Sequence, residues 1–266
     1  MLDHARWFGR ALLRVLVFRR PTNDRNWSPD LVRLPEITFG SDGTVTIRSI
    51  RNFTYRSVTD YTPGYYDRTF AVSDIQTVWF MVEPFSVVAA HTLVSFGLSD
   101  GTYIAISVEI RKTVGQVFSQ LAVLFFLRRH ELVYVIGDER DLIRLRTNYR
   151  QDTVYLYPVQ ATPSQAQALL VDMLKRAQRL QQEPEFYNPF TNTCLTNIVA
   201  HANAIAPKRI PWSYKLLIAT LADELAYSIG LLDQSLPFRQ LRKKHLINDR
   251  AREYGDDPDF SQKIRV

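Results

Sequence analysis

The chain has 266 residues, of which 46% are hydrophobic and 23% charged, an ordinary globular composition that excludes a collagen-like or wholly disordered protein. The 33 basic and 27 acidic residues give a net charge of +6, and because they are interleaved, nucleic acid is a disfavoured partner. The single cysteine excludes an internal disulfide, and no run approaches the roughly 20 apolar residues of a membrane-spanning helix.

Residues 1–35 are predicted to form a basic amphipathic helix followed by a linker. Between residues 1 and 20, apolar side chains recur at helical spacing and are interleaved with arginines. Arg14 interrupts the apolar stretch, which argues against a signal peptide. Such a helix suits an anionic membrane surface, or it packs its apolar side on the domain. Residues 21–35 are polar, contain three prolines and are interpreted as an extended linker.

Residues 36–266 are predicted to form one domain with a helical C-terminal extension, and this domain begins with a hairpin. Ile37–Phe39 and Val45–Ile47 flank the turn signal Ser41-Asp42-Gly43. Arg48–Tyr66 lacks periodicity and predicts a long loop of the kind that often borders a site. Ile75–Val82 predicts a buried strand.

The strongest hairpin signal in the chain joins His91–Leu98 to Thr102–Ile110 through Ser99-Asp100-Gly101. Side chains on a strand alternate between its two faces. A three-residue turn matches the apolar faces of both runs and gathers His91, Ser107 and Glu109 on the other face, with His91 opposite Glu109. A two-residue turn would shift the pairing by one residue. We expect the first register. Glu109 could instead pair with Arg111 or another arginine at the strand end.

Further elements follow in chain order. Leu121–Arg129 is apolar and ends in basic residues. Thr162 followed by Pro163 and Gln165 predicts the start of a helix that runs to about Gln182. The remaining predicted segments are strands at Glu131–Ile136, Leu142–Leu145 and Val154–Val159, a helix at Pro211–Ile229, and a basic amphipathic segment at Leu236–Arg252.

Cys194 is predicted to lie in the first turn of a helix that includes Leu195–Ala206. The N–H groups and positive dipole at a helix start stabilise a thiolate, which would lower the pKa of Cys194, and they can also hold an oxyanion. A nucleophilic cysteine needs a base, and His91 is the candidate, with Glu109 or Ser107 to orient it. The alternative is a histidine satisfied inside the sheet and an unreactive thiol. His130 and His201 are rival bases, although His201 lies about two helical turns from the cysteine.

Three segments, in this order, resemble the bacterial Lnb N-terminal periplasmic domain family: His91–Arg111, Tyr134–Asn148 and Tyr187–Asn197. The resemblance extends from about Arg48 to the end of the chain. It implies an α+β, circularly permuted papain-like (NlpC-like) fold with an antiparallel sheet packed against helices. In that fold the strand with the histidine precedes the helix with the cysteine.

The resemblance also implies cysteine-dependent acyl transfer in the bacterial envelope, because the family is named for lipoprotein N-acylation. It implies that Cys194 is the nucleophile that forms a thioester, that His91 is the general base, and that Glu109 or Ser107 is the orienting group. Thr193 stands where the family is expected to have asparagine, which leaves the oxyanion role to backbone N–H groups or to Asn192. No cofactor and no metal are expected.

The expected partners are a lipoprotein or phospholipid acyl substrate and a membrane surface, in the periplasm or cell envelope. Two alternatives are a papain-like amidase or peptidase with the same dyad, and a non-catalytic envelope binding module. Aromatic residues between 53 and 66 could line an acyl groove or simply pack their loop. Several arginines could bind anionic head groups or form ion pairs with nearby acids: Arg48, Arg51, Arg56, Arg111, Arg144 and Arg146.

Overall fold

The computed structural model describes residues 20–116, 130–206 and 208–265. The predicted N-terminal helix, apart from Arg20, and the apolar segment Leu121–Arg129 lie outside the described residues.

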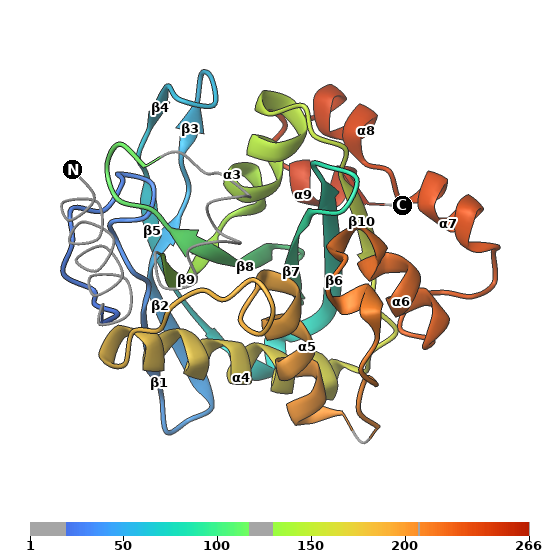
Figure 1. Cartoon of the computed structure of the whole chain (residues 1–266), viewed down its shortest axis with the longest axis horizontal. Coiled ribbons are helices and arrows are strands. Elements are labelled where there is room, and N and C mark those ends of the chain that lie inside the picture. Colours follow the sequence, from blue (N-terminus) through green and yellow to red (C-terminus); the bar gives the residue numbers. More distant parts are fainter. Residues whose placement is uncertain (1–19, 117–129, 207, 266) are drawn as a thin grey trace, which may run out of the picture.

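An eight-stranded sheet forms the centre of the molecule (Figure 1). Its strands are β1 (Glu36–Phe39), β2 (Thr44–Arg51), β5 (Tyr65–Ala71), β6 (Ile75–Pro84), β7 (Ala90–Leu98), β8 (Tyr103–Arg111), β9 (Glu131–Gly137) and β10 (Tyr155–Pro158). Their order is β1-β2-β9-β8-β7-β6-β10, and β5 also pairs with β2. A separate short hairpin joins β3 (Thr54–Tyr55) to β4 (Tyr61–Thr62). All neighbours in the sheet are antiparallel except β2 and β9, which run parallel, so the sheet is mixed rather than purely antiparallel as predicted.

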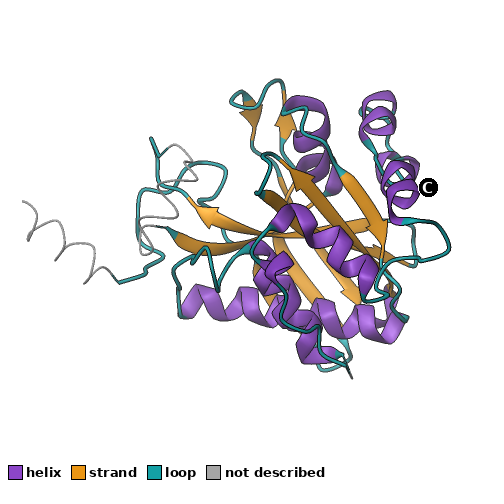
Figure 2. Ribbon diagram, turned by 45° about the vertical axis from the view of Figure 1, so that its right-hand side comes forward, coloured by secondary structure: helices purple, strands orange, loops and turns teal. Residues whose placement is uncertain are grey.

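Helices lie on both faces of this sheet (Figure 2). One apolar core packs the sheet against α4 (Pro163–Gln182), α5 (Cys194–Ile205), α6 (Ala222–Ser228) and α7 (Phe238–Lys244). A second core packs the opposite face against α3 (Glu139–Arg144), α8 (Asn248–Glu253) and α9 (Phe260–Lys263). Within residues 20–116, 130–206 and 208–265, the other short helices are η1 (Val72–Asp74), the π-helix η2 (Leu145–Tyr149), η3 (Tyr214–Leu216) and η4 (Ala219–Leu221). The fold is therefore α+β, and its C-terminal segment docks on the sheet.

The register of the β7–β8 hairpin is the one that the three-residue turn predicts. Gly97 pairs with Tyr103, and the last pair of the ladder is Leu93 with Ser107. The apolar even-numbered side chains of β7 belong to the core under α4 and α5, whereas Leu93 belongs to the core on the other face. The His91 side chain therefore projects from the face of the sheet that packs against α3, α8 and α9.

The predicted starts of α4 and α5 are confirmed. The Thr162 side chain accepts a hydrogen bond from the Gln165 backbone, and the Gln165 side chain accepts one in return from the Thr162 N–H, so α4 begins with a complete capping box. Thr193 is the N-cap of α5 and accepts from the backbone N–H of Thr196, which places Cys194 at the first helical position.

Three predictions of local secondary structure are wrong. Arg48–Tyr66 is not one long loop, because β2 continues past a bulge at Ser49, β3 and β4 form a hairpin, and β5 begins at Tyr65. Leu142–Leu145 is helical because the Asp138 carboxylate accepts from the Arg140 N–H and starts α3. The segment 211–229 is not one helix. The Ser213 side chain accepts from Lys215 N and starts a 3₁₀ turn, and α-helix begins only at Ala222.

Candidate active site

The Cys194 side chain is buried at the start of α5, against strand β7. Cys194 is 7% exposed and belongs to the apolar core beneath α4 and α5. The N–H groups of Thr92 and Leu195 and the Thr92 hydroxyl face the sulfur. Thr92 is the residue that follows His91, so the thiol meets β7 one position away from the predicted base.

Burial raises the pKa of the Cys194 thiol above its ordinary value. The groups of Thr92 and Leu195 act in the other direction, but burial outweighs them. The predicted lowering of this pKa by the helix start is therefore wrong for the substrate-free chain. The reason is that the sulfur lies in an apolar core rather than on an open helix end.

The other three predicted residues meet on the opposite face of the sheet. The Nε2 atom of His91 lies 2.7 Å from Ser107 Oγ, and the Ser107 hydroxyl donates to Glu109 Oε1 over 2.7 Å. His91 Nε2 is also 3.3 Å from Glu109 Oε1. Because the single hydroxyl hydrogen of Ser107 goes to Glu109, Ser107 accepts from His91 Nε2–H. A neutral ring then carries its lone pair on Nδ1, which is the nitrogen available as a base.

Buried charges surround this triad. Arg146 donates to Glu109 Oε1 over 2.8 Å and to Glu83 Oε2 over 2.7 Å. Glu109 therefore pairs with Arg146 and not with Arg111, whose guanidinium donates to the carbonyl oxygens of residues 31 and 32. On β6, Glu83 is the strand partner of His91.

These surroundings set the ionisation of each group. Burial lowers the pKa of His91 to about 4, and Arg146 adds to the effect while Glu109 opposes it, so the imidazole is neutral at pH 7. Burial acts to raise the pKa of Glu109, but the attractions of His91 and Arg146 outweigh it and hold the pKa below its usual range. Burial raises the pKa of Glu83 to about 7 against the attraction of Arg146.

Side chains from both faces of the sheet line one cavity of about 340 Å³ at this point; its lining includes His91, Glu109, Arg146, Tyr187 and Cys194. The pairing of β7 with β8 ends at Leu93 and Ser107. Beyond this point His91 pairs with a residue of β6, and Glu109 pairs with a residue of β9. The two strands separate there. The thiol and the imidazole thus line one cavity, although the thiol lies on one face of β7 and the imidazole on the other.

Asn192, the other residue predicted to support an oxyanion, holds the loop before α5. Its side-chain N–H groups donate to the Phe186 carbonyl over 3.0 Å and to Glu185 Oε2 over 3.3 Å, and its oxygen accepts from Asn197 over 2.8 Å. Because both amide hydrogens are used, support for an oxyanion would come from backbone N–H groups, the other expected source.

The rival histidine on α5 has a different role. His201 Nδ1 lies 2.6 Å from Asp172 Oδ2, and its Nε2 lies 2.6 Å from the hydroxyl of Tyr134. Tyr134 in turn donates to Asn197, the residue that holds Asn192. Both ring nitrogens of His201 are therefore engaged in a buried network that supports the loop before Cys194.

Most of the polar and aromatic residues considered as lipid ligands are used within the fold. Arg51 is paired with buried Asp141, and Arg146 holds the two carboxylates described above. Further ion pairs join Arg48 to Asp67, Arg56 to Asp60 and Arg144 to Asp256. The rings of Phe53, Tyr55, Tyr61 and Tyr65 pack on one another, so this cluster packs its own segment instead of lining a groove.

Sequence reasoning missed Glu83 and Thr92 as parts of the site. Alternation along β6 could have placed Glu83 beside His91, but only with the β6–β7 register in hand. Thr92 contacts the sulfur through the packing of α5 on β7, which no local pattern reveals. Within the described ranges, no three His, Cys, Asp or Glu side chains are grouped so that they could hold a metal ion.

Comparison with known proteins identifies the family of this chain. The model of the Lnb N-terminal periplasmic domain matches residues 61–220, a span that contains β5–β10, α5, His91 and Cys194. No curated protein and no solved structure matches the chain. None of the helices in the described part of the chain is both long and apolar enough to span a membrane. Because the match covers more than half of the residues, the chain belongs to the Lnb N-terminal periplasmic domain family.

Proposed function

We propose that this chain is a cysteine-dependent acyltransferase of the bacterial envelope that carries the acyl group as a thioester on Cys194. The observation that carries the proposal is the shared cavity, into which the first residue of α5 brings a thiol and β7 brings a neutral imidazole. The chain order, with the histidine strand before the cysteine helix, is that of a permuted papain-like fold and supports the same reading.

The reaction proceeds in two balanced steps. In the first, the sulfur of Cys194 attacks the carbonyl carbon of an ester, His91 Nδ1 takes the thiol proton, and that proton leaves with the alcohol. In the second, an amine attacks the thioester, the thiol is restored, and an amide is released. The substrate class is a lipoprotein or phospholipid acyl chain, and the acceptor is an amino group, as the family's association with lipoprotein acylation suggests.

The supporting residues have separate tasks in this mechanism. Ser107 and Glu109 hold His91 Nε2–H, which keeps the lone pair on Nδ1. Arg146 keeps Glu109 ionised. Because the pKa of the thiol is raised and that of the imidazole lowered, the resting pair is neutral, and the proton moves only as the sulfur attacks.

Intact-mass spectrometry tests the proposal. The chain is incubated with a synthetic diacylglyceryl lipopeptide or with phosphatidylglycerol vesicles, and the expected result is one acyl adduct that hydroxylamine removes, as thioesters require. Cys194→Ser should carry no hydroxylamine-sensitive adduct. An adduct of equal size and lability on Cys194→Ser, or none on the unaltered chain with any donor, would refute the assignment. Release of free acid or cleavage of a peptide without transfer to an amine would indicate the amidase or peptidase alternative.

A non-catalytic envelope binding module is the second candidate, and the raised pKa of the buried thiol favours it. In that case neither His91→Ala nor Cys194→Ser would change the binding of a lipopeptide, and no adduct would form. The two candidates therefore differ in a single measurement.

A further inference from the structure

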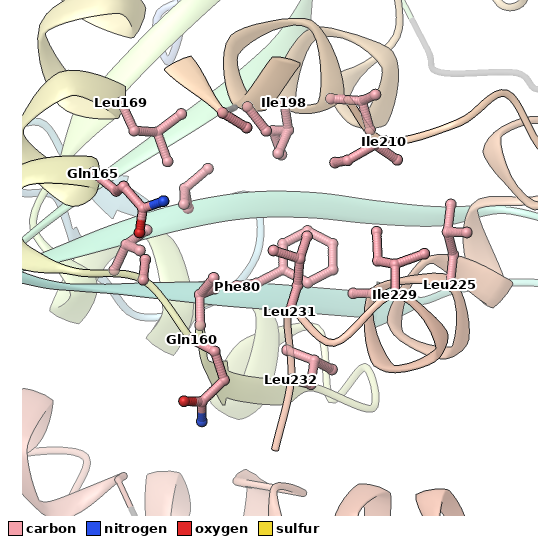
Figure 3. Close-up of a pocket in the computed structure, with 18 of the residues that line it drawn as sticks. Phe80, Gln160, Gln165, Leu169, Ile198, Ile210, Leu225, Ile229, Leu231 and Leu232 are labelled. Atoms are coloured by element: carbon pink, nitrogen blue, oxygen red, sulfur yellow. The ribbon is translucent and has the colours of Figure 1, made fainter. Parts of the chain in front are cut away.

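A second cavity, of about 140 Å³, lies between α4, α5, α6 and the sheet (Figure 3). Of the side chains that line it, only those of Gln160 and Gln165 are polar. Figure 3 shows Leu169, Ile198 and Ile210 on one side of the space and Leu231 and Ile229 on the other, with the amide of Gln160 pointing away from them. The lining carries no charged group, so it offers no ionic partner to a charged ligand.

One end of this cavity lies at the start of α5, whereas the thiol itself lines the cavity of about 340 Å³. Leu195, the residue after Cys194, lines the second cavity. On β7, Val94 lines it as well, and Val94 follows Thr92 on the face that carries the sulfur. From there the space extends along α5 to Ile205. Ile205 and Ile229 are only partly buried, so the far end opens towards solvent.

We propose that this cavity binds one unbranched hydrocarbon chain, with its polar end at the Cys194 side. The link to the thioester rests on the proposed function, whereas the binding of the hydrocarbon chain does not depend on it. An engineered apolar cavity of about 150 Å³ holds benzene, so about six carbons fill the enclosed part. The space is too small for a helix or a protein segment. An unfilled apolar cavity also costs stability, and a bound chain removes that cost.

Calorimetric titration of Cys194→Ser with saturated fatty acids of increasing length tests the binding without any acylation. Each added methylene should strengthen binding about fourfold while it enters the cavity. The gain should level off once about six to eight carbons are enclosed. Affinity that is independent of chain length, or that rises without levelling off as it does for partition into a micelle, would overturn the proposal.

A matched pair of substitutions on α5 locates the site. Ala202 lines the cavity, so Ala202→Phe should fill it and weaken the binding of octanoate at least tenfold. Ala204 is exposed on the same helix, and Ala204→Phe should leave the affinity unchanged. Melting temperatures show whether both variants fold. Equal affinities of two folded variants would contradict the site.

Two further comparisons identify the source of the hydrocarbon chain and distinguish its binding from the acyl-transfer reaction. Competition between octanoate and dioctanoyl phosphatidylglycerol indicates that a lipid ester chain enters, whereas binding of octanoate without competition indicates the free acid. In both cases the affinity must fall in Ala202→Phe. If the protein binds neither ligand, the proposed site is refuted. If octanoate binds in this way but the unaltered chain forms no adduct on Cys194, the cavity is retained and the acyltransferase proposal fails.

Discussion

The sulfur of Cys194 lies against Thr92 on one face of strand β7, while the side chain of His91, the preceding residue, projects from the other face. The two side chains therefore line the same cavity, where β7 and β8 separate beyond Leu93 and Ser107. Apart from this cavity of about 340 Å³, the protein covers most of both side chains.

The first prediction concerns alkylation of the thiol. The chain has one cysteine, so iodoacetamide labelling reports on Cys194 alone. Because burial raises its pKa, the labelling rate should stay low at pH 7 and rise only above the free-cysteine pKa of about 8.5. The chain unfolded in urea is the control and should titrate near 8.5. Rapid labelling of the folded chain at pH 6 would contradict the buried, neutral thiol.

The second prediction concerns the acid side of the activity profile. The pKa of His91 is lowered to about 4, so the base remains unprotonated through the weakly acidic range. The profile of kcat/KM against pH should therefore fall off near pH 4, not near 6.5. His91→Ala should lower kcat/KM by about a hundredfold or more and remove this limb. A limb near 6.5 would mean that the ring is solvated.

The third prediction separates the two candidates for the orienting group. Ser107→Ala removes the hydroxyl that bridges His91 Nε2 and Glu109, whereas Ser107→Thr keeps it. Loss of one such hydrogen bond corresponds to about 1 kcal/mol, so Ser107→Ala should lower kcat about fivefold with KM unchanged. Glu109→Gln should cost more, because it also removes the negative charge that pairs with the buried Arg146 guanidinium.

Measurement of the His91 pKa by NMR completes this test. Ser107→Ala should change it, and Ser107→Thr should restore both the pKa and kcat. Unchanged kcat and pKa in the alanine variant would leave Glu109 as the only orienting group.

The fourth prediction concerns stability against pH. Burial raises the pKa of Glu83 to about 7, above its ordinary 4.5. Between these values the folded chain holds a proton that the unfolded chain has released, so the free energy of unfolding falls as pH rises from about 4.5 to 7 and is level above that. Glu83→Gln removes this contribution. Urea unfolding at several pH values should show the difference between the two proteins changing by up to about 3 kcal/mol. A constant difference would contradict the shift.

Much of the site can be read from local sequence. The turn at residues 99–101 and the alternation of β7 and β8 predict the register, and with it the common face of His91, Ser107 and Glu109. An N-cap at Asn192 or Thr193 and the apolar run after it predict that Cys194 lies in the first turn of a helix. Both inferences succeed because they depend on residues that are close in the chain.

The remaining properties arise from contacts between distant segments, and only the tertiary structure decides them. Packing of α5 on β7 buries the thiol, and this burial reverses the direction in which the helix start alone would shift its pKa. Arg146 pairs with Glu83 and Glu109 because α3 and η2 cover the second face of the sheet. Desolvation and ion pairing depend on the whole surroundings of a group in space, which no local pattern of residues specifies.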